Sequence, residues 1–213
     1  MNNYKPALST YNSKLKLFYS PNSPYARKCR VVILEKGLQD KVELVSLMPS
    51  DNPPELIAAN PLGTVPTLVL DNGKSLCESP VICEYLDSLS AQNPLFPADK
   101  SARFEALSLA ALGDGIMAAA VSCVMEGRRP EEKRYQYWTD RKENAAKRAI
   151  AAISKLNLDK DNWNIGTINI AIALAYADLR IPNINWRDDN KELANWFDFV
   201  NKIPSMVATA PVP

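Results

Sequence analysis

Two short motifs in the first half of the chain carry residue types that bind a small peptide. The first is the segment 60–68 (NPLGTVPTL), in which Val65-Pro66 opens a strand of alternating apolar residues. The second is the segment 78–80 (Glu-Ser-Pro), where a short strand ends at an acid and a Ser-Pro pair begins a helix. We expect these motifs to place a backbone amide edge, a carboxylate and a helix N-terminus close together, a trio that can hold a small zwitterionic peptide.

Each motif also has an interpretation that needs no ligand. Val65-Pro66 is then an ordinary strand opening, and Ser79 is a helix N-cap beside a solvated acid. The alternation after Pro66 and the adjacent Glu78-Ser79 pair favour the ligand-binding interpretation. We expect a cis Val65-Pro66 bond, which turns the N–H and C=O of Val65 outward to pair with a peptide as an added strand does. At Ser79, capping and binding are compatible because the first turn of a helix has more than one free N–H.

The composition bounds the remaining possibilities. The chain has 213 residues, of which 46% are hydrophobic, and this suits one large domain or two small ones with a real core. Its net charge of +1 gives no reason to expect nucleic acid or an acidic membrane as a partner. No run approaches the ~18 apolar residues of a membrane span. Residues 1–13 are polar and lack the apolar core of a signal peptide, so we interpret them as an N-terminal extension.

Histidine and cysteine usage excludes several kinds of site. The sequence has no histidine, which removes histidine-based triads, histidine general bases and the commonest zinc sites. The four cysteines have no metal-type spacing and lie within apolar segments: Cys29, Cys77, Cys83 and Cys123. We therefore expect no metal, and reduced, buried thiols in a cytoplasmic protein.

The elements that must position the motifs alternate over the first ninety residues and are helical afterwards. Periodicity predicts strands over 15–19, 41–45, 67–70 and 74–77 and helices over 24–36, 53–59 and 79–89, in the order βαβαββα. The segment 92–97 carries two prolines and is interpreted as a linker. Further helices are predicted over 101–125, 130–156, 165–179 and 191–203, with Pro130 opening the second and Pro204 ending the last.

This layout and four motifs resemble those of the cytosolic glutathione transferases. The motifs are SPYARK with VVILEKG in the segment 23–37, NPLGTVP at 60–66, ESPVI at 78–82 and PLFP at 94–97. The resemblance covers roughly residues 14 to 205. It is strongest to bacterial members of no settled class and weaker to the plant classes that use serine. It implies an α+β thioredoxin-like domain over 14–91, an all-helical domain over 98–213, and a homodimer.

One position departs from the family pattern. The buried helix predicted from residue 165 usually begins, in this family, with Ser or Thr followed three residues later by Asp. Here these positions are Asn164 and Thr167. Asn caps well, but the reciprocal carboxylate is missing, which puts the stability or folding rate of this helix in doubt rather than the chemistry.

The resemblance assigns the chemistry to the loop before the first helix. Glutathione has a thiol with a pKa of about 8.5, and the thiolate is the nucleophile. Lowering that pKa by about two units takes roughly 2.7 kcal/mol, which one or two hydrogen bonds to a charged sulfur supply. By resemblance to the serine-using transferases, Ser23 is the donor that stabilises the thiolate, with Asn22 and Ser20 as further candidates. The alternative is that Ser23 is only an N-cap.

The same resemblance assigns residues to the rest of glutathione. Val65 and Pro66 pair with the cysteinyl backbone, Ser79 binds the γ-glutamyl carboxylate, and Glu78 accepts from the γ-glutamyl ammonium. The glycyl carboxylate needs a cation or an amide donor, and the sequence leaves three candidates open: Asn52, Lys41 and Arg27.

The second substrate is expected between the two halves, facing Ser23. Tyr25 is a candidate for the near wall, and Asp114 and Met117, with the neighbouring Gly113 and Ala118, are candidates from the helix over 101–125. Two glycines in that helix indicate close packing or a kink, either near the cleft or at a subunit contact. Arg128-Arg129 is interpreted as a solvated helix end.

We therefore expect a glutathione transferase that attacks small apolar electrophiles or reduces peroxides, as in detoxification. A first alternative is a non-catalytic stress or regulatory protein of the same fold that binds a protein partner. A second is a glutathione-dependent disulfide reductase. The loop SPYA at 23–26 resembles the CPYC of glutaredoxins with both cysteines replaced, so direct dithiol exchange has no nucleophile.

Overall fold

The computed structural model describes residues 14–211, so the proposed extension over 1–13 lies outside the described residues. The N-terminal half contains four strands and three α-helices in the expected order. They are β1 (Leu15–Tyr19), α1 (Pro24–Glu35), β2 (Val42–Ser46), α2 (Pro54–Ala59), β3 (Thr67–Val69), β4 (Ser75–Cys77) and α3 (Ser79–Ser88). Each element agrees with its predicted position to within a few residues.

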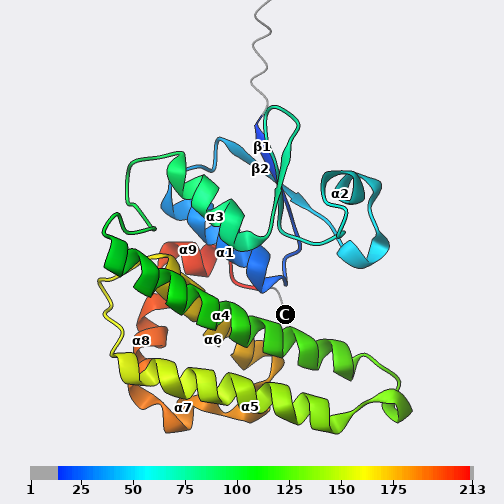
Figure 1. Ribbon diagram of the computed structural model, residues 1–213, viewed down its shortest axis with the longest axis vertical. Helices are drawn as coiled ribbons and strands as arrows, with labels where there is room; N and C mark the ends of the chain where they lie inside the picture. Colours follow the sequence, from blue (N-terminus) through cyan, green and yellow to red (C-terminus); the bar gives the residue numbers. More distant parts are fainter. Residues whose placement is uncertain (1–13, 212–213) are drawn as a thin grey trace, which may run out of the picture.

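The four strands form one mixed sheet in the order β2-β1-β3-β4. β1 runs parallel to β2 and antiparallel to β3, and β3 and β4 form a hairpin. Leu17 and Leu68, which face each other across β1 and β3, are both fully buried. Helices α1 and α3 pack together between the sheet and the C-terminal half, whereas α2 stands apart from them (Figure 1). This mixed sheet with its helices confirms the expected thioredoxin-like fold.

Helix α1 begins and ends at the residues that its sequence indicates. The Ser23 side chain accepts a hydrogen bond from the N–H of Ala26 at 3.2 Å, and Pro24 follows at the first helical position. The helix buries Cys29 and its apolar neighbours against α3. It ends at Glu35, and Gly37, just after the C-cap Lys36, has a φ of +63° in the left-handed region that favours glycine.

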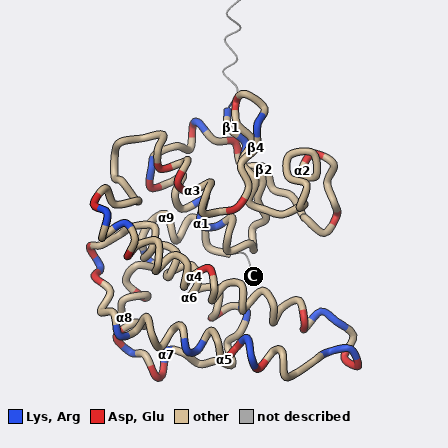
Figure 2. The backbone as a smooth tube through the Cα atoms, in the orientation of Figure 1, with Lys and Arg blue, Asp and Glu red and all other residues tan. Residues whose placement is uncertain are grey.

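The C-terminal half is helical throughout its regular elements, as expected. They are α4 (Lys100–Gly127), α5 (Gln136–Ile153), α6 (Ile165–Arg180), α7 (Trp186–Asp189), α8 (Lys191–Val200) and α9 (Pro204–Ala208). Helix α6 is almost wholly buried between α4, α1 and α8. Figure 2 agrees with this central place, because charged residues of both signs gather on the outer helices and loops and are sparse along α6.

Two predicted helix boundaries are wrong, both at prolines. Pro130 opens only a 3-10 turn over Glu131–Lys133, and α5 begins later, at Gln136, because the backbone at Arg134 is extended. Pro204 does not end the last helix. Helix α8 has already ended at Val200, and Pro204 begins the short helix α9, consistent with the preference of proline for the first helical turn.

The expected weakness at the start of α6 is absent, because a hydroxyl replaces the missing carboxylate. Asn164 Oδ1 accepts from the N–H of Gly166 at 2.8 Å and of Thr167 at 3.3 Å. In return, Thr167 Oγ1 accepts from the N–H of Asn164 at 2.9 Å. The capping box is therefore complete, and the doubt about this helix is removed.

The expectation that no segment resembles a membrane span is wrong for α4. This helix is long and apolar enough to cross a bilayer, by length and composition only. Its apolar residues have another explanation, because the helix packs against α5 and α6 and buries one face, which includes Ile116, Met117 and Ala120. Core helices of soluble proteins can meet the same criterion.

Buried polar contacts join α1 to the C-terminal half. Lys28, only 1% exposed, pairs with Asp114 of α4 at 2.8 Å, and Asn169 Nδ2 of α6 donates to the same carboxylate oxygen at 3.1 Å. Arg27, which is also buried, donates to the carbonyl of Met206 in α9 at 3.0 Å and to Thr209 at 3.3 Å. These contacts fix how the two halves face each other.

Candidate functional site

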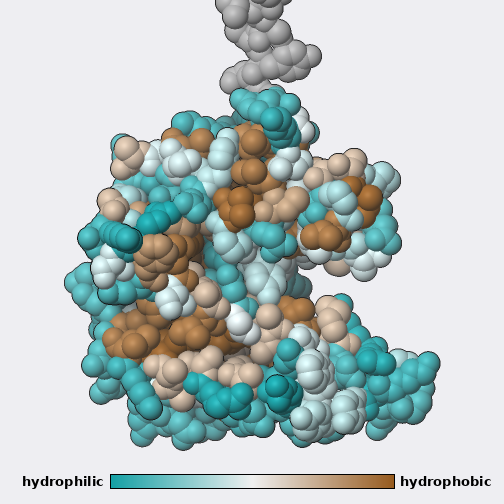
Figure 3. Space-filling view, viewed as in Figure 1, coloured by the Kyte–Doolittle hydropathy of each residue, from teal (hydrophilic) through white to brown (hydrophobic). Residues whose placement is uncertain are grey.

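A cavity of about 610 Å³ lies between the two halves and receives residues from both. Figure 3 shows the molecule hollowed on the side where α2 and the connection between α4 and α5 project. This volume is typical of small-molecule sites. The lining residues are Ser20, Asn22, Ser23, Pro24, Tyr25, Met48, Pro49, Ser50, Thr64, Val65, Pro66, Glu78, Ser79, Val121, Val124, Met125, Arg128, Tyr176 and Arg180.

The loop before α1 brings Ser23 to the cavity with its hydroxyl proton available. Ser23 Oγ accepts from the N–H of Ala26, so the side chain does cap the helix. A hydroxyl can accept and donate at the same time, and capping therefore leaves its proton free for a ligand. Ser20 and Asn22 line the same part of the cavity, and the Ser20 carbonyl accepts from the N–H of Ser23 at 3.0 Å. The structure thus brings all three candidate donors together.

The loop before β3 presents the backbone of Val65 at the cavity, and the Val65–Pro66 bond is cis. The conformation of this loop is held by hydrogen bonds from Asn60, which is 1% exposed. Asn60 Nδ2 donates to the carbonyl of Thr64 at 3.1 Å and to Thr67 Oγ1 at 3.0 Å. Because Asn60 bonds to the Thr64 carbonyl and the Thr67 hydroxyl, hydrogen bonds within the protein hold the Val65 backbone in place without a ligand.

The turn from β4 into α3 places Glu78 and Ser79 at the cavity. Glu78 is exposed and has a φ of 69°, a left-handed conformation that a non-glycine residue adopts at a cost of about 1–3 kcal/mol. Strain of this kind gathers at binding sites. Ser79 is 2% exposed and is the first helical residue, so the prediction that it is the N-cap is wrong. The N-cap is Glu78, whose side chain makes no capping bond, and the first-turn N–H groups stay open to a ligand.

Tyr25 is half-buried at the edge of the cavity and stays neutral. Burial, followed by the negative charge of Asp114, raises the pKa of the Tyr25 hydroxyl to about 12. At physiological pH this phenol is therefore a hydrogen-bond donor and not a base. The expectation that Tyr25 lines the site agrees with its place in the cavity.

The C-terminal wall is formed by two helix faces that the sequence analysis missed. Val121, Val124, Met125 and Arg128 follow the i, i+3, i+4, i+7 spacing of one face of α4, and Arg128 immediately follows the helix. Tyr176 and Arg180 come from the last turns of α6. Arg128 is exposed at the end of α4, as predicted for a solvated helix end, and it also lines the cavity. The apolar spacing of Val121, Val124 and Met125 before Arg128 is the sequence pattern from which this wall could have been predicted.

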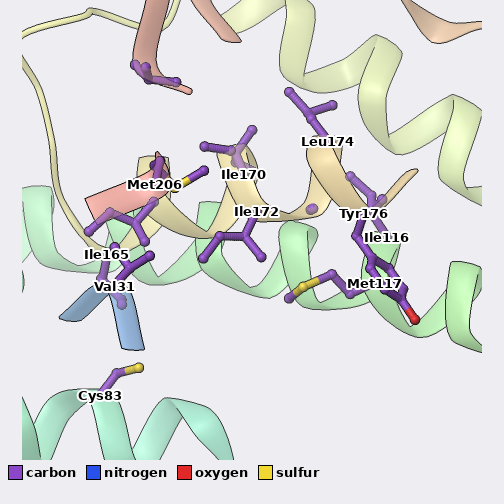
Figure 4. Packing of buried hydrophobic residues seen from close by; sticks show 14 of the residues in the cluster. Val31, Cys83, Ile116, Met117, Ile165, Ile170, Ile172, Leu174, Tyr176 and Met206 are labelled. Carbon is purple, nitrogen blue, oxygen red and sulfur yellow. The ribbon is translucent and has the colours of Figure 1, made fainter. Parts of the chain in front are cut away.

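Two residues predicted to line the second-substrate site do not. Met117 is fully buried and belongs to the core cluster, part of which is drawn in Figure 4. Asp114 is committed to Lys28 and Asn169. Both predictions are wrong because the wall begins about two helical turns further along α4, at Val121.

The three candidates for the glycyl carboxylate also lie away from the cavity lining. Arg27 is buried and donates to α9, and Lys41 is exposed beside β2. Asn52, with a φ of 48°, follows a 3-10 turn whose Pro49 and Ser50 line the cavity instead. In this turn, Ser50 and not Asn52 is therefore the polar residue that lines the cavity.

Gly113 is buried against the backbone of α6, where a Cβ atom would lie 3.0 Å from the Asn169 carbonyl oxygen. Gly115, in contrast, faces open space. Of the two explanations for these glycines, close packing holds for Gly113, and its contact is within this chain.

Known proteins match the chain over most of its length. Residues 17–94 match the family model "Glutathione S-transferase, N-terminal domain". The chain is 29% identical over 201 residues to the uncharacterised GST-like protein YibF of Escherichia coli K12, covering 92% of this chain and 98% of that protein. It is 40% identical to a glutathione transferase family member from Pseudomonas fluorescens Pf-5 whose crystal structure contains glutathione, with a TM-score of 0.89 over 94% of this chain and all of that one.

A second structure from Pseudomonas fluorescens Pf-5, also 40% identical, holds S-(propanoic acid)-glutathione and has a TM-score of 0.82 over 94% of this chain and 98% of that one. The overall fold is thus shared with two solved structures that are each 40% identical to this chain. The resemblance seen in the sequence is confirmed: the chain belongs to the glutathione transferase family.

Proposed function

We propose that this protein is a glutathione transferase, which binds glutathione and directs its thiolate at a small apolar electrophile. The observation that carries the proposal is the convergence of Ser23, Val65 and the Glu78-Ser79 pair, from three separate loops, on one cavity of about 610 Å³. The opposite wall of that cavity is largely apolar, with Val121 and Val124. The Pseudomonas relatives were crystallised with glutathione and with a glutathione carrying a substituent on sulfur, which supports a site that holds glutathione with space beside its sulfur.

Glutathione is proposed to lie along the wall formed by the thioredoxin-like domain. Its γ-glutamyl carboxylate accepts from the hydroxyl and N–H of Ser79, where the positive end of the α3 dipole favours an anion. Its ammonium donates to the Glu78 carboxylate. The cysteinyl backbone pairs with Val65, which leaves the glycyl end near Ser50 and the sulfur near Ser23.

Ser23 is proposed to stabilise the thiolate. Its hydroxyl donates to the sulfur while its oxygen still accepts from Ala26. One hydrogen bond to a charged group is worth about 1.5–3 kcal/mol, which lowers the thiol pKa by about one to two units. In conjugation, the sulfur lone pair forms a bond to the electrophilic carbon, and the electron pair of the broken bond leaves with the displaced group. The thiol proton passes to solvent. The same thiolate would begin the reduction of a peroxide.

The test of this proposal is the pH dependence of conjugation. We expect kcat/KM for 1-chloro-2,4-dinitrobenzene to rise through the pKa of bound glutathione, and Ser23→Ala to move that pKa upward by about one to two units. Ser23→Thr keeps both the cap and the donor and should restore the profile. Ser20→Ala and Asn22→Ala show whether another donor of the loop acts instead. An unchanged profile in Ser23→Ala would remove Ser23 from the mechanism.

Three further assignments belong to this proposal. We propose a homodimer in the cytoplasm, with domain boundaries at 14–91 and 98–213. No cysteine is among the described residues that line the cavity, which argues against a dithiol disulfide reductase. An equilibrium sedimentation experiment tests the dimer, and limited proteolysis within 92–97 tests the boundary.

A further inference from the structure

Two arginines line the cavity without a carboxylate partner. Arg128 follows α4 and Arg180 ends α6, and neither forms an ion pair within residues 14–211. The Nε atom of Arg180 is buried and has no hydrogen-bond partner there. A buried, unpaired polar atom costs about 1–3 kcal/mol, so a ligand that supplies the missing acceptor would recover that free energy.

Several other described arginines also form no ion pair, so the place of Arg128 and Arg180 in the cavity, and not their lack of a carboxylate, sets these two apart. Arg129 pairs with Glu126, and Arg187 pairs with Asp178 at 2.7 Å and with Asp198 at 2.9 Å. A cation in the last turn of a helix is explained by the helix dipole. The dipole does not explain why Arg128 and Arg180 both line the cavity while Arg129, the next residue, does not.

Tyr176 connects the two arginines. The Arg180 guanidinium lies 5.8 Å from the centre of the Tyr176 ring, and Tyr176 itself is 7% exposed. Burial raises the pKa of the Tyr176 hydroxyl, while the positive charges of Arg180 and Arg128 act in the opposite direction. Both cations are therefore close enough to act on one group within the cavity.

These cations lie on the wall opposite the proposed glutathione site. The residues assigned to glutathione belong to the thioredoxin-like domain, whereas Arg128 and Arg180 belong to the helical half, next to Val124 and Tyr176. Apolar side chains and guanidinium groups thus share the wall that faces the second substrate. Guanidinium groups match carboxylates in shape and bind them through paired N–H donors.

We propose that the second substrate is an apolar electrophile that carries a carboxylate, and that Arg128 and Arg180 bind this carboxylate. The inference rests on the proposed function and specifies its substrate class. The acid end is held at the helical wall, the apolar body packs on Val121 and Val124, and the reactive carbon faces Ser23.

A suitable probe is 4-chloro-3-nitrobenzoate, with its methyl ester as the neutral control. The thiolate sulfur bonds to the ring carbon that carries chlorine, the C–Cl bond breaks with its electron pair leaving as chloride, and the thiol proton passes to solvent. The product, S-(4-carboxy-2-nitrophenyl)glutathione, keeps the carboxylate, so its binding reports on the arginines without any need for turnover.

The binding experiment is calorimetry with three ligands: this product, the same product with its benzoate carboxylate as the methyl ester, and glutathione itself. We expect wild type to bind the acid at least about tenfold more tightly than the ester, as expected for a hydrogen bond to a charged group. Arg128→Gln and Arg180→Gln should remove this preference and leave the affinity for glutathione unchanged. Arg129→Gln, beside the cavity but not lining it, should keep the preference. In turnover assays with 4-chloro-3-nitrobenzoate and its methyl ester, kcat/KM divided by the uncatalysed rate constant should show the same preference for the acid in wild type. Arg128→Gln and Arg180→Gln should lose that preference.

The outcomes separate this inference from the proposed function. Equal affinity of wild type for acid and ester overturns the inference, whatever the variants do. If Arg180→Gln lowers the affinity for glutathione as much as the affinity for the acid product, the arginines bind a carboxylate of glutathione itself. The inference is then wrong, while the proposed function stands. If neither glutathione nor either product binds, the proposed function fails together with the inference.

Discussion

The ion pair between Lys28 and Asp114 is expected to determine how firmly the two halves hold together. Lys28 comes from α1 and is 1% exposed, and its Nζ lies 2.8 Å from the carboxylate of Asp114 in α4. In Asp114→Leu, Lys28 keeps its charge but loses its partner. Breaking a buried pair in this way costs about 3–5 kcal/mol.

The lower end of that range applies because the Asp114 side chain is 27% exposed and water can reach the pair. For a chain of this length, about 3 kcal/mol corresponds to a fall in Tm of roughly 6–12 °C. The double variant Lys28→Met with Asp114→Leu removes both charges and should lie within about 1 kcal/mol of wild type. Glu43→Gln breaks the exposed Lys16–Glu43 pair instead and should change the free energy of unfolding by less than about 0.5 kcal/mol.

The assay is urea unfolding at pH 7 and one fixed protein concentration, followed by tryptophan fluorescence. The expected order of stability is wild type and the double variant together, with Asp114→Leu well below them. If Asp114→Leu loses less than about 1 kcal/mol, or if the double variant is no more stable than the single one, the pair is not what joins α1 to α4.

Three further predictions concern packing, pH and thiols. Gly166→Ala should destabilise the protein, because the new Cβ atom would lie 2.6 Å from the Ala106 carbonyl oxygen. Gly115→Ala, which meets open space, should stabilise it by up to about 1 kcal/mol in thermal unfolding. Because the pKa of Tyr25 is raised to about 12, the folded state holds this proton after the unfolded state has released it. Stability should therefore fall as the pH rises from 10 towards 12, and Tyr25→Phe should reduce that fall; an identical pH profile in the variant would contradict the assignment. Cys77 is partly exposed, whereas Cys29 is fully buried with its thiol pKa raised by burial, so a thiol reagent at pH 8 should label Cys77 first and Cys29 only on unfolding.

The parts of the site that depend on local sequence were predictable from it. Ser23 before Pro24, Val65 before Pro66 and Ser79 before Pro80 each mark a turn whose geometry is decided within a few residues. The thioredoxin-like order of strands and helices follows for the same reason, since hydrophobic period and turn residues are local signals. These positions all reach the cavity.

The helical wall depends on how the two halves pack, and local signals do not contain that information. A two-turn error along α4 placed the wall at Asp114 and Met117 instead of Val121 and Arg128. Asp114 was assigned to the cavity as a residue of the predicted helix over 101–125, but its partner is the buried Lys28 in the other half. Arg180 ends a helix that looked central and buried, and only the tertiary structure shows that its last turn reaches the cavity.

The most direct test of the central claim is a calorimetric titration of the full chain with reduced glutathione. Wild type should bind it saturably. Ser79→Ala should weaken the binding by about tenfold or more, because a hydrogen bond to a carboxylate at the start of α3 is lost. Ser88→Ala, an exposed position at the other end of the same helix, should bind as wild type does. No heat from wild type at millimolar glutathione would contradict the account and direct the search towards a protein partner.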